Sequence, residues 1–409
     1  MSGADQGMAM TDNPMERAQA LFFEGTAHFD AGRLDPARDS FAAALTLVPG
    51  RPSVQANLGV TLFRLGQWSD AVAQLEPAVA AEPDQPDAWL ALGLSRKALA
   101  QWPAAMAALE RGLVRGAGTA EAWLALAHIQ ERLGRESAAL QSVERALQMD
   151  DQSAAAWSAR GGLLLLVHQE QEAVRSFERA IALGADESLH RFYLASVRGD
   201  TTPAQPPRAY VEALFDQYAD NFEQHLTEVL RYCGHEVLLQ PLVNAETHYP
   251  LVLDLGCGSG LCARVVRGQA GAIDGVDLSS SMVEQARATG LYRRVAHEDL
   301  LPFLAASDET ADLVMAADVF IYVGALDAVF AAVRERLRPG GCFAFSVERH
   351  DGEQDLQLLP SMRYAHAPAY VVRLADTHGF RVSRQWEGLL RHDQDRPIPG
   401  LYFHLEATA

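Results

Sequence analysis

The sequence predicts two domains, an all-α superhelix of repeats followed by an α/β domain built on a mostly parallel sheet. The first half aligns with itself at a period of 34 residues, and from Leu251 onward strand-like apolar runs alternate with helical runs. Between the two, the segment GDTTPAQPPR holds three prolines and cannot continue a helical pattern. We therefore expect a repeat array over 17–198, a linker over 199–208 and an α/β domain over 209–409.

Composition and charge restrict the class of protein and its partners. The chain has 409 residues and a formal net charge of −19. A polyanion would be repelled by this charge, which argues against nucleic acid as a partner. No apolar run approaches the ~20 residues that span a bilayer, and the first residues lack a signal-peptide pattern, so we expect a cytoplasmic protein without a membrane partner. No C-x-x-C spacing occurs, so four free thiols are expected, at Cys233, Cys257, Cys262 and Cys342.

Small residues recur at fixed positions of the 34-residue unit. The eighth position holds Gly25, Gly59, Gly93, Ala127 and Gly161, and the twentieth holds Ala37, Ala71, Ala105, Ala139 and Ala173. Tryptophan recurs at the fourth position of three units, and proline closes the first two units. These five units resemble the tetratricopeptide repeat (TPR), in which each unit is a pair of antiparallel helices that stacks on the next. A partial sixth unit, SLHRFYLASV, is expected to cap the stack.

The TPR resemblance implies an inner groove that binds a protein or peptide. Its lining would come from the first helix of each pair, at Phe22, Phe29, Ala56, Val60, Phe63, Leu90, Leu94 and Lys97. The basic, Asn-rich clamp that holds a peptide carboxylate in some TPRs is missing, which favours an apolar helix or an extended peptide as the ligand. The alternative is that these residues pack against the second domain or a second copy of the chain.

A glycine-rich turn opens the second domain. The apolar run LVLDL contains Asp254, and the turn that follows holds Gly256, Gly258 and Gly260 before the helical run LCARVV. Bare backbone between a strand and a helix is how α/β folds hold a nucleotide-like cofactor at the carboxyl edge of the sheet. The dinucleotide fingerprint would need glycine at position 261, which is Leu261, so a nicotinamide oxidoreductase is disfavoured.

An acid two residues before G-x-G-x-G resembles the first motif of class I S-adenosylmethionine-dependent methyltransferases. That resemblance implies a Rossmann-like, seven-stranded, mostly parallel sheet, with the runs FRVSRQWEGL and IPGLYFHLEA at its antiparallel end. It further implies that Asp254 holds the methionine end of the cofactor, Asp277 the ribose hydroxyls, and Asp299 the adenine amino group. The other cofactor contacts expected from the resemblance are Gly256, Cys257, Gly258, Gly260, Leu278, Met282, Leu300 and Asp318. For Cys257, a catalytic thiol is the alternative to a small side chain that fits the turn.

The methyl acceptor is harder to place. A sulfonium methyl is already activated, so the protein must align the acceptor and exclude water, with a base only if the acceptor carries a proton. The chain reads DVFIYVG at 318–324, which lacks the [DN]-P-P-[YF] sequence and disfavours an amide or exocyclic amine acceptor. The candidate acceptor elements are a lid at 209–226, the pair Asp318 and Tyr322, and the stretch 348–366. His366 is the expected base, with a surface or helix-capping histidine as the alternative.

The whole arrangement resembles a bacterial family of TPR-containing methyltransferases, from about residue 17 to the end of the chain. The resemblance implies methyl transfer from S-adenosylmethionine to an unassigned acceptor, while the repeats recruit a protein that is either the substrate or its carrier. The alternative is a TPR adaptor whose S-adenosylmethionine-binding domain is a sensor or non-catalytic. The acceptor, a small molecule or a protein side chain, stays open.

Overall fold

The chain forms two compact units that divide after Ala185. The structure is a computed structural model that describes residues 13–116, 118–199, 201–218, 231–245, 247–306, 308–393 and 396–409. Each unit is described separately below. Among the helices in these ranges, none combines the length and the apolar character needed to cross a membrane.

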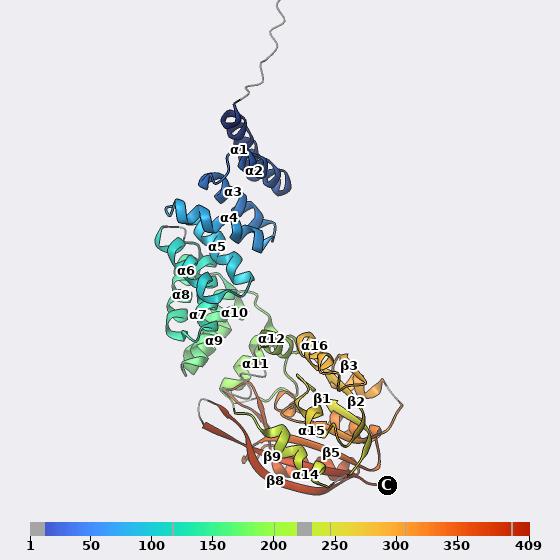
Figure 1. Cartoon of the computed structure of the whole chain (residues 1–409). Helices are drawn as coiled ribbons and strands as arrows, with labels where there is room; N and C mark the ends of the chain where they lie inside the picture. Colours follow the sequence, from blue (N-terminus) through green and yellow to red (C-terminus); the bar gives the residue numbers. More distant parts are fainter. Residues whose placement is uncertain are drawn as a thin grey trace, which may run out of the picture. The chain divides into compact units, whose positions relative to one another are not determined.

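The first unit is a stack of helix pairs, which Figure 1 shows in blue and green. Its helices are α1 (Pro14–Asp30), α2 (Leu34–Leu47), α3 (Pro52–Arg64), α4 (Trp68–Ala81), α5 (Pro86–Ala98), α6 (Trp102–Val114), α7 (Ala120–Arg132), α8 (Glu136–Met149), α9 (Ala154–Leu166) and α10 (Glu170–Ala182). Two helices therefore fall in each 34-residue unit, as the sequence predicts. Pro52 and Pro86 occupy the first helical position of α3 and α5, where a missing N–H costs no hydrogen bond.

The glycine at the eighth position of a unit lets its two helices approach closely. A Cβ placed on Gly59 would lie 2.5 Å from Leu75 Cγ, and one on Gly161 would lie 2.4 Å from Phe177 Cε1. The fourth unit has Ala127 at this position, and the residue equivalent to Leu75 is the smaller Val143. Ala127 and Val143 are both fully buried in one cluster. The smaller Val143 therefore makes room for the methyl group of Ala127.

The second unit contains a nine-stranded sheet. Its strands are β1 (Tyr249–Leu255), β2 (Ala270–Asp277), β3 (Arg294–His297), β4 (Ala311–Ala316), β5 (Leu337–Arg349), β6 (Leu356–Leu358), β7 (Tyr364–His366), β8 (Phe380–Asp393) and β9 (Arg396–Ala407). The order β3-β2-β1-β4-β5 is parallel, β9 pairs antiparallel with β5, and β8 pairs antiparallel with β9. These are the seven expected strands. The short strands β6 and β7 are additional. Strand β7 pairs parallel with the last two residues of β5, and β6 pairs antiparallel with β7.

Helices surround this sheet. They are α11 (Glu187–Arg198), α12 (Arg208–Tyr218), α14 (Gly234–Asn244), α15 (Leu261–Val266), α16 (Ser280–Ala288), α17 (Leu300–Ala305), α18 (Asp327–Arg336) and α19 (Pro368–Thr377), with a short 3₁₀ turn, η3, at Phe320–Tyr322. Helix α11, expected from the sequence to cap the repeat stack, groups with the second unit. Its Phe192 is buried with Leu358 and Tyr364 in one apolar cluster, which accounts for this grouping.

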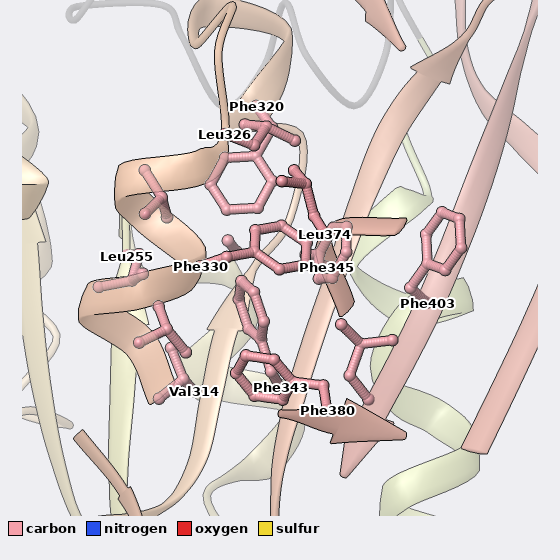
Figure 2. Close-up of a cluster of buried hydrophobic side chains, with 14 of the residues drawn as sticks. Leu255, Val314, Phe320, Leu326, Phe330, Phe343, Phe345, Leu374, Phe380 and Phe403 are labelled. Carbon is pink, nitrogen blue, oxygen red and sulfur yellow. The ribbon is translucent and has the colours of Figure 1, made fainter. Parts of the chain in front are cut away.

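A cluster of aromatic rings fills one face of the sheet. Phe343 and Phe345 on β5 have ring centroids 4.6 Å apart, and Phe330 from α18 packs edge-on against both. Figure 2 shows these rings between α18 and the strands, with Phe403 stacked on Phe345. Aromatic pairs of this kind add about 0.5–1.5 kcal/mol each beyond the burial of their area. The cluster fixes β4 and β5, whose carboxyl ends carry candidate site residues.

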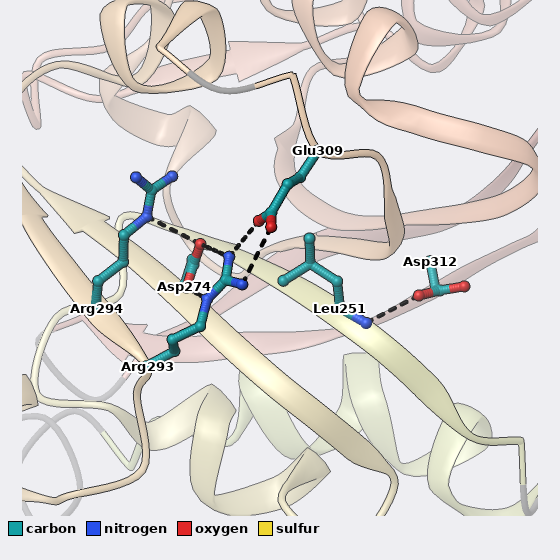
Figure 3. A network of polar contacts seen from close by, with 6 residues as sticks. All are labelled: Leu251, Asp274, Arg293, Arg294, Glu309 and Asp312. Carbon is teal, nitrogen blue, oxygen red and sulfur yellow. Dashed lines mark hydrogen bonds and ion pairs between the residues drawn. The ribbon is translucent and has the colours of Figure 1, made fainter.

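Charged side chains join the parallel strands at the other edge of the sheet. Asp274 on β2 is buried and pairs with Arg293 at 2.6 Å and with Arg294 at 2.9 Å (Figure 3). Arg293 also pairs with Glu309, and Asp312 accepts the backbone N–H of Leu251 at 2.8 Å. Because one buried acid has two arginine partners, β3 is held in register beside β2.

Candidate active site

The glycine turn after β1 has the backbone conformation that its sequence demands. Gly256, Gly258 and Gly260 have φ values of +62°, +51° and +92°, a region that side chains with a Cβ rarely adopt. A Cβ on Gly256 would also lie 2.7 Å from Val319 Cγ2, so the turn packs closely against the segment that follows β4. At these three positions the turn therefore carries no side chain of its own.

Asp277 ends β2 and fastens the glycine turn. Its Oδ2 accepts the backbone N–H of Gly258 at 2.9 Å, and its Oδ1 accepts that of Ser279 at 3.0 Å. Burial raises the pKa of this carboxyl, and the backbone N–H groups partly offset that effect. Each carboxylate oxygen retains acceptor capacity beyond these bonds, because a carboxylate offers about four lone-pair sites.

Asp254 lies beside the turn on β1 and is 1% exposed. The hydroxyl of Tyr292 donates to Asp254 Oδ2 at 2.7 Å, whereas Oδ1 has no hydrogen-bond partner among the described atoms. Burial raises the pKa of Asp254 to about 7; the bond from Tyr292 lowers it, and the charge of Asp277 raises it. Nearby Ser259 is also buried, and its Oγ has no such partner either. These two buried oxygens therefore have hydrogen-bonding capacity that an external group could use.

The residues expected near an adenine ring lie around the ends of β2 and β3. Leu278 and Leu300 are half-buried, Asp299 is exposed, and Met282 is 0% exposed in α16. Ser279 caps α16 by accepting the N–H of Met282 at 3.3 Å, and this bond fixes the start of the helix. Their contacts with a cofactor stay predictions.

The thiol of Cys257 packs inside the protein. It is 5% exposed, and its Sγ would lie 3.1 Å from a Cβ placed on Gly275. Burial raises the pKa of Cys257, and the charges of Asp254 and Asp277 raise it further. A reactive thiol needs a lowered pKa and access to solvent, so this environment favours the packing role.

Asp318 follows β4 and is held by two bonds. Its φ is +59°, an unusual conformation for a residue other than glycine. Its N–H donates to Ser346 Oγ at 2.9 Å, and its Oδ1 accepts from Arg391 Nη1 at 2.8 Å. Arg391, 1% exposed on β8, also donates from Nη2 to Glu348 Oε2 at 2.7 Å. Burial raises the pKa of Glu348, and the charge of Arg391 acts against that rise.

His366 lies on β7 with no exposed surface. Its Nε2–H donates to the carbonyl of Gly324 at 2.7 Å, and its ring stacks on Tyr370. Burial lowers the pKa of His366 to about 4. This enclosure favours a role in packing and positioning, and the role of base stays a prediction for an activity assay.

Tyr322 in η3 is half-buried and meets the helix that precedes the sheet. Its ring and that of Phe215 from α12 lie 5.1 Å apart, edge to face. Helix α12 also packs on α16, the helix that holds Met282. The first part of the expected lid thus contacts Tyr322 and α16, where the acceptor and the cofactor are expected. Residues 219–226 of the lid lie outside the described residues.

The repeat unit holds a groove of its own, with a volume of about 670 Å³. It is lined by α6, α7 and α8, and Trp123, Leu126 and Val114 supply apolar surface. Val114 is 85% exposed, which is unusual for a large apolar side chain. None of the eight groove residues expected from the TPR resemblance lines it.

Two residues that bind candidate site acids, Tyr292 and Arg391, are not among those that the sequence singles out. Tyr292 stands in the loop between α16 and β3, and Arg391 in the charged end of an apolar strand. The sequence GLLRHD does carry a signal for the second, since an arginine within a buried strand needs an acidic partner. We find no comparable signal for Tyr292.

Comparison with known proteins identifies both parts of the chain. Residues 252–341 match a family model described as a methyltransferase domain, and residues 28–95 and 90–154 match models of the tetratricopeptide repeat. The solved structure of the MamA protein matches with 19% identity and a TM-score of 0.38, over 46% of this chain and 98% of that one.

Several similar curated proteins are methyltransferases by name. The malonyl-[acyl-carrier protein] O-methyltransferase of Salmonella typhimurium is 29% identical over 202 residues, which is 47% of this chain and 73% of that protein. The enzyme of the same description from Legionella pneumophila is 29% identical over 39% of this chain and 58% of its own length. The ubiquinone biosynthesis O-methyltransferase of Thiobacillus denitrificans is 29% identical over 36% of this chain and 72% of its own length.

Proposed function

We propose that this chain, which joins tetratricopeptide repeats to a methyltransferase domain, transfers a methyl group from S-adenosylmethionine to an oxygen acceptor presented by a protein partner. The observation that carries the proposal is the edge formed by the glycine turn, Asp254 and Asp277. The bound cofactor would supply a methyl group on a sulfonium, which needs no further activation.

The residues at this edge fit such a cofactor. Three glycines with positive φ leave backbone open to a ligand, and Asp277 offers two oxygens to a pair of hydroxyl donors. Asp254 adds a buried oxygen without a partner among the described atoms, which suits a donor group on the ligand. In this assignment the adenine ring of the cofactor is surrounded by Leu278, Met282, Asp299 and Leu300. The floor of the cofactor site is formed by Gly256, Cys257, Gly258 and Gly260.

An oxygen acceptor is supported by two separate observations. The similar proteins from Salmonella typhimurium and Thiobacillus denitrificans are both O-methyltransferases by name. Here the segment after β4 also lacks the prolines of the [DN]-P-P-[YF] sequence, reading Asp318-Val-Phe-Ile-Tyr322 instead. We place the acceptor beside Asp318 and Tyr322, where α12 lies close enough to limit the access of water.

The repeats would bring the acceptor to this site. Stacked helix pairs offer an extended surface, and one groove on it exposes Val114 and Trp123. The relative in Salmonella typhimurium is named for a substrate attached to a carrier protein. A carrier or a substrate protein bound to the repeats would likewise raise the local concentration of acceptor.

Calorimetric titration of the purified chain with S-adenosylmethionine tests the cofactor assignment. We expect saturable binding that weakens by at least about tenfold in Asp277→Ala, because the lost carboxylate bonds are each worth about 1.5–3 kcal/mol. Asp376→Ala, an exposed acid on α19, is the matched control and should bind as the wild type does. A folded wild-type chain that binds no S-adenosylmethionine would overturn the proposal.

Labelled S-adenosylmethionine in a lysate of a strain that lacks the protein then tests the acceptor. A product whose label is released by mild base would be a methyl ester, and a base-stable product would be an ether or an N-methyl group. Binding without any labelled product would favour the alternative, an adaptor that senses the cofactor.

A further inference from the structure

The two oxygens of Asp254 differ in their surroundings. Oδ2 accepts a hydrogen bond from Tyr292, whereas Oδ1 is buried and has no partner among the described atoms. A buried acceptor without a donor costs about 1–3 kcal/mol, so such atoms usually face a water or a ligand. The free oxygen lies in the strand that leads into the glycine turn.

Tyr292 is fixed by close packing on backbone. A Cβ on Gly275 would lie 2.9 Å from Tyr292 Cε1, and one on Gly260 would lie 3.3 Å from Cε2. Glycine at these two positions therefore makes room for the ring, which bridges β2 and the start of α15. Because the ring is wedged there, its hydroxyl points at Asp254 from a fixed place.

Within the part of the chain that the structure describes, no positively charged side chain acts on Asp254. The groups that act on its pKa, after burial itself, are the hydroxyl of Tyr292 and the carboxylate of Asp277. The thiols of Cys257 and Cys262 also face it. None of these groups is a cation, so the described residues leave the negative charge of Asp254 without a counter-charge. A buried acid of this kind favours a cationic ligand.

We propose that Tyr292 is a positioning residue that holds the Asp254 carboxylate so that its free oxygen, Oδ1, receives the ammonium end of the cofactor, directly or through one water. The inference rests on the proposed function and assigns to Tyr292 the discrimination between ligands that carry this ammonium and ligands that lack it. It also couples cofactor binding to loss of the proton from Asp254, because a cationic ligand favours the ionised carboxylate. Burial raises the pKa of Asp254 to about 7, so this link operates near neutral pH.

Two ligands separate this role from simple support of the turn. S-adenosylhomocysteine carries the amino-acid end, and methylthioadenosine has the same adenosine without it. We expect Tyr292→Phe to weaken binding of S-adenosylhomocysteine about tenfold while binding of methylthioadenosine changes less than about twofold. Tyr249→Phe removes a hydroxyl from another buried tyrosine, on β1, and is the control that should change neither.

The pH dependence gives a second readout. Affinity of the wild type for S-adenosylhomocysteine should rise as the pH increases through about 7, where Asp254 loses its proton, and affinity for methylthioadenosine should stay level. In the wild type, the hydrogen bond from Tyr292 lowers the pKa of Asp254. Because Tyr292→Phe removes this bond, the midpoint of the rise in affinity should move to higher pH.

The outcomes are distinguishable. If Tyr292→Phe weakens the binding of both ligands equally, or of neither, the positioning role is overturned while the cofactor assignment stays intact. A wild type that binds neither ligand would overturn the proposed function itself. If Tyr292→Phe does not fold, the wild-type comparison decides, and a level S-adenosylhomocysteine affinity from about pH 5.5 to about 8.5 would contradict the inference.

Discussion

Arg391 reaches from β8 to Asp318 beyond the end of β4, and its Nη1 lies 2.8 Å from Asp318 Oδ1. The same guanidinium is 2.7 Å from Glu348 on β5. One buried cation therefore holds both Asp318, beside which the acceptor is proposed, and Glu348 on β5. Asp318 has a left-handed backbone conformation, which persists only where its surroundings enforce it, and this ion pair is one such constraint.

Removing this cation should destabilise the second unit. We expect Arg391→Met to lower the free energy of unfolding by about 3 kcal/mol or more, because two largely buried carboxylates lose their counter-charge. Chemical denaturation measures the change. Adding Glu348→Gln to the variant should recover part of the loss.

The control for this experiment is an exposed pair. Arg381→Met breaks the ion pair with Glu406, whose partners are 63% and 43% exposed, and it should cost less than about 1 kcal/mol. If the two arginine substitutions lower the free energy of unfolding equally, the buried network stabilises the chain no more than an exposed ion pair does.

His366 should make stability depend on pH. Its pKa is about 4 in the folded chain, against 6.5 as the ordinary value, so the unfolded chain binds the proton first. Above about pH 6.5, His366 should not change the pH dependence of the free energy of unfolding. Between about pH 6.5 and about pH 4, its contribution should lower this free energy by about 1.4 kcal/mol for each pH unit that the pH falls. Asp254, with its raised pKa, acts in the opposite direction, so the wild type is best compared with His366→Gln.

The difference in the free energy of unfolding between these two chains should shrink steadily as the pH falls from about 6.5 to about 4. A constant difference would mean that His366 is not a buried neutral histidine. Once an acceptor is known, turnover by His366→Gln decides the role of base. Full turnover by a folded variant would exclude it.

Helix α12 should slow release of the cofactor. Phe215→Ala removes the edge-to-face contact with Tyr322, a contact of about 0.5–1.5 kcal/mol, so release of S-adenosylhomocysteine should quicken by about two- to tenfold. Stopped-flow displacement measures the rate. Phe23→Ala, at a ring that is 61% exposed in the first unit, is the control. An unchanged rate in Phe215→Ala would argue against a lid.

Local patterns predicted the elements that carry the site. Asp254 and Asp277 fall at strand ends that continuous apolar runs make visible, and parallel strands bring these ends to one edge. The glycine turn was predictable for the same reason, because its conformation depends on adjacent residues.

Contacts between distant positions were not predictable. Tyr292 meets Asp254 across 38 positions and Arg391 meets Asp318 across 73, and no periodicity relates these pairs. Helix α11 follows the repeat pattern closely enough to suggest a cap, yet Phe192 packs with Tyr364 far along the chain. Which surface an amphipathic helix covers is a tertiary property that its own sequence does not specify.

The helix crossings of the repeat unit allow a test by exchange between repeats. We expect Gly59→Ala to lower the free energy of unfolding by about 1–3 kcal/mol, because the new methyl group would lie 2.5 Å from Leu75 Cγ, even though alanine favours a helix by about 1 kcal/mol. Leu75→Val in the same chain recreates the Ala127 and Val143 pairing of the fourth repeat and should restore part of the loss. Denaturation of the wild type, the two single variants and the double variant gives the coupling energy, expected to favour the double variant by at least about 0.5 kcal/mol. Strictly additive effects would show that the two positions are independent, and that the valine of the fourth repeat does not compensate for its alanine.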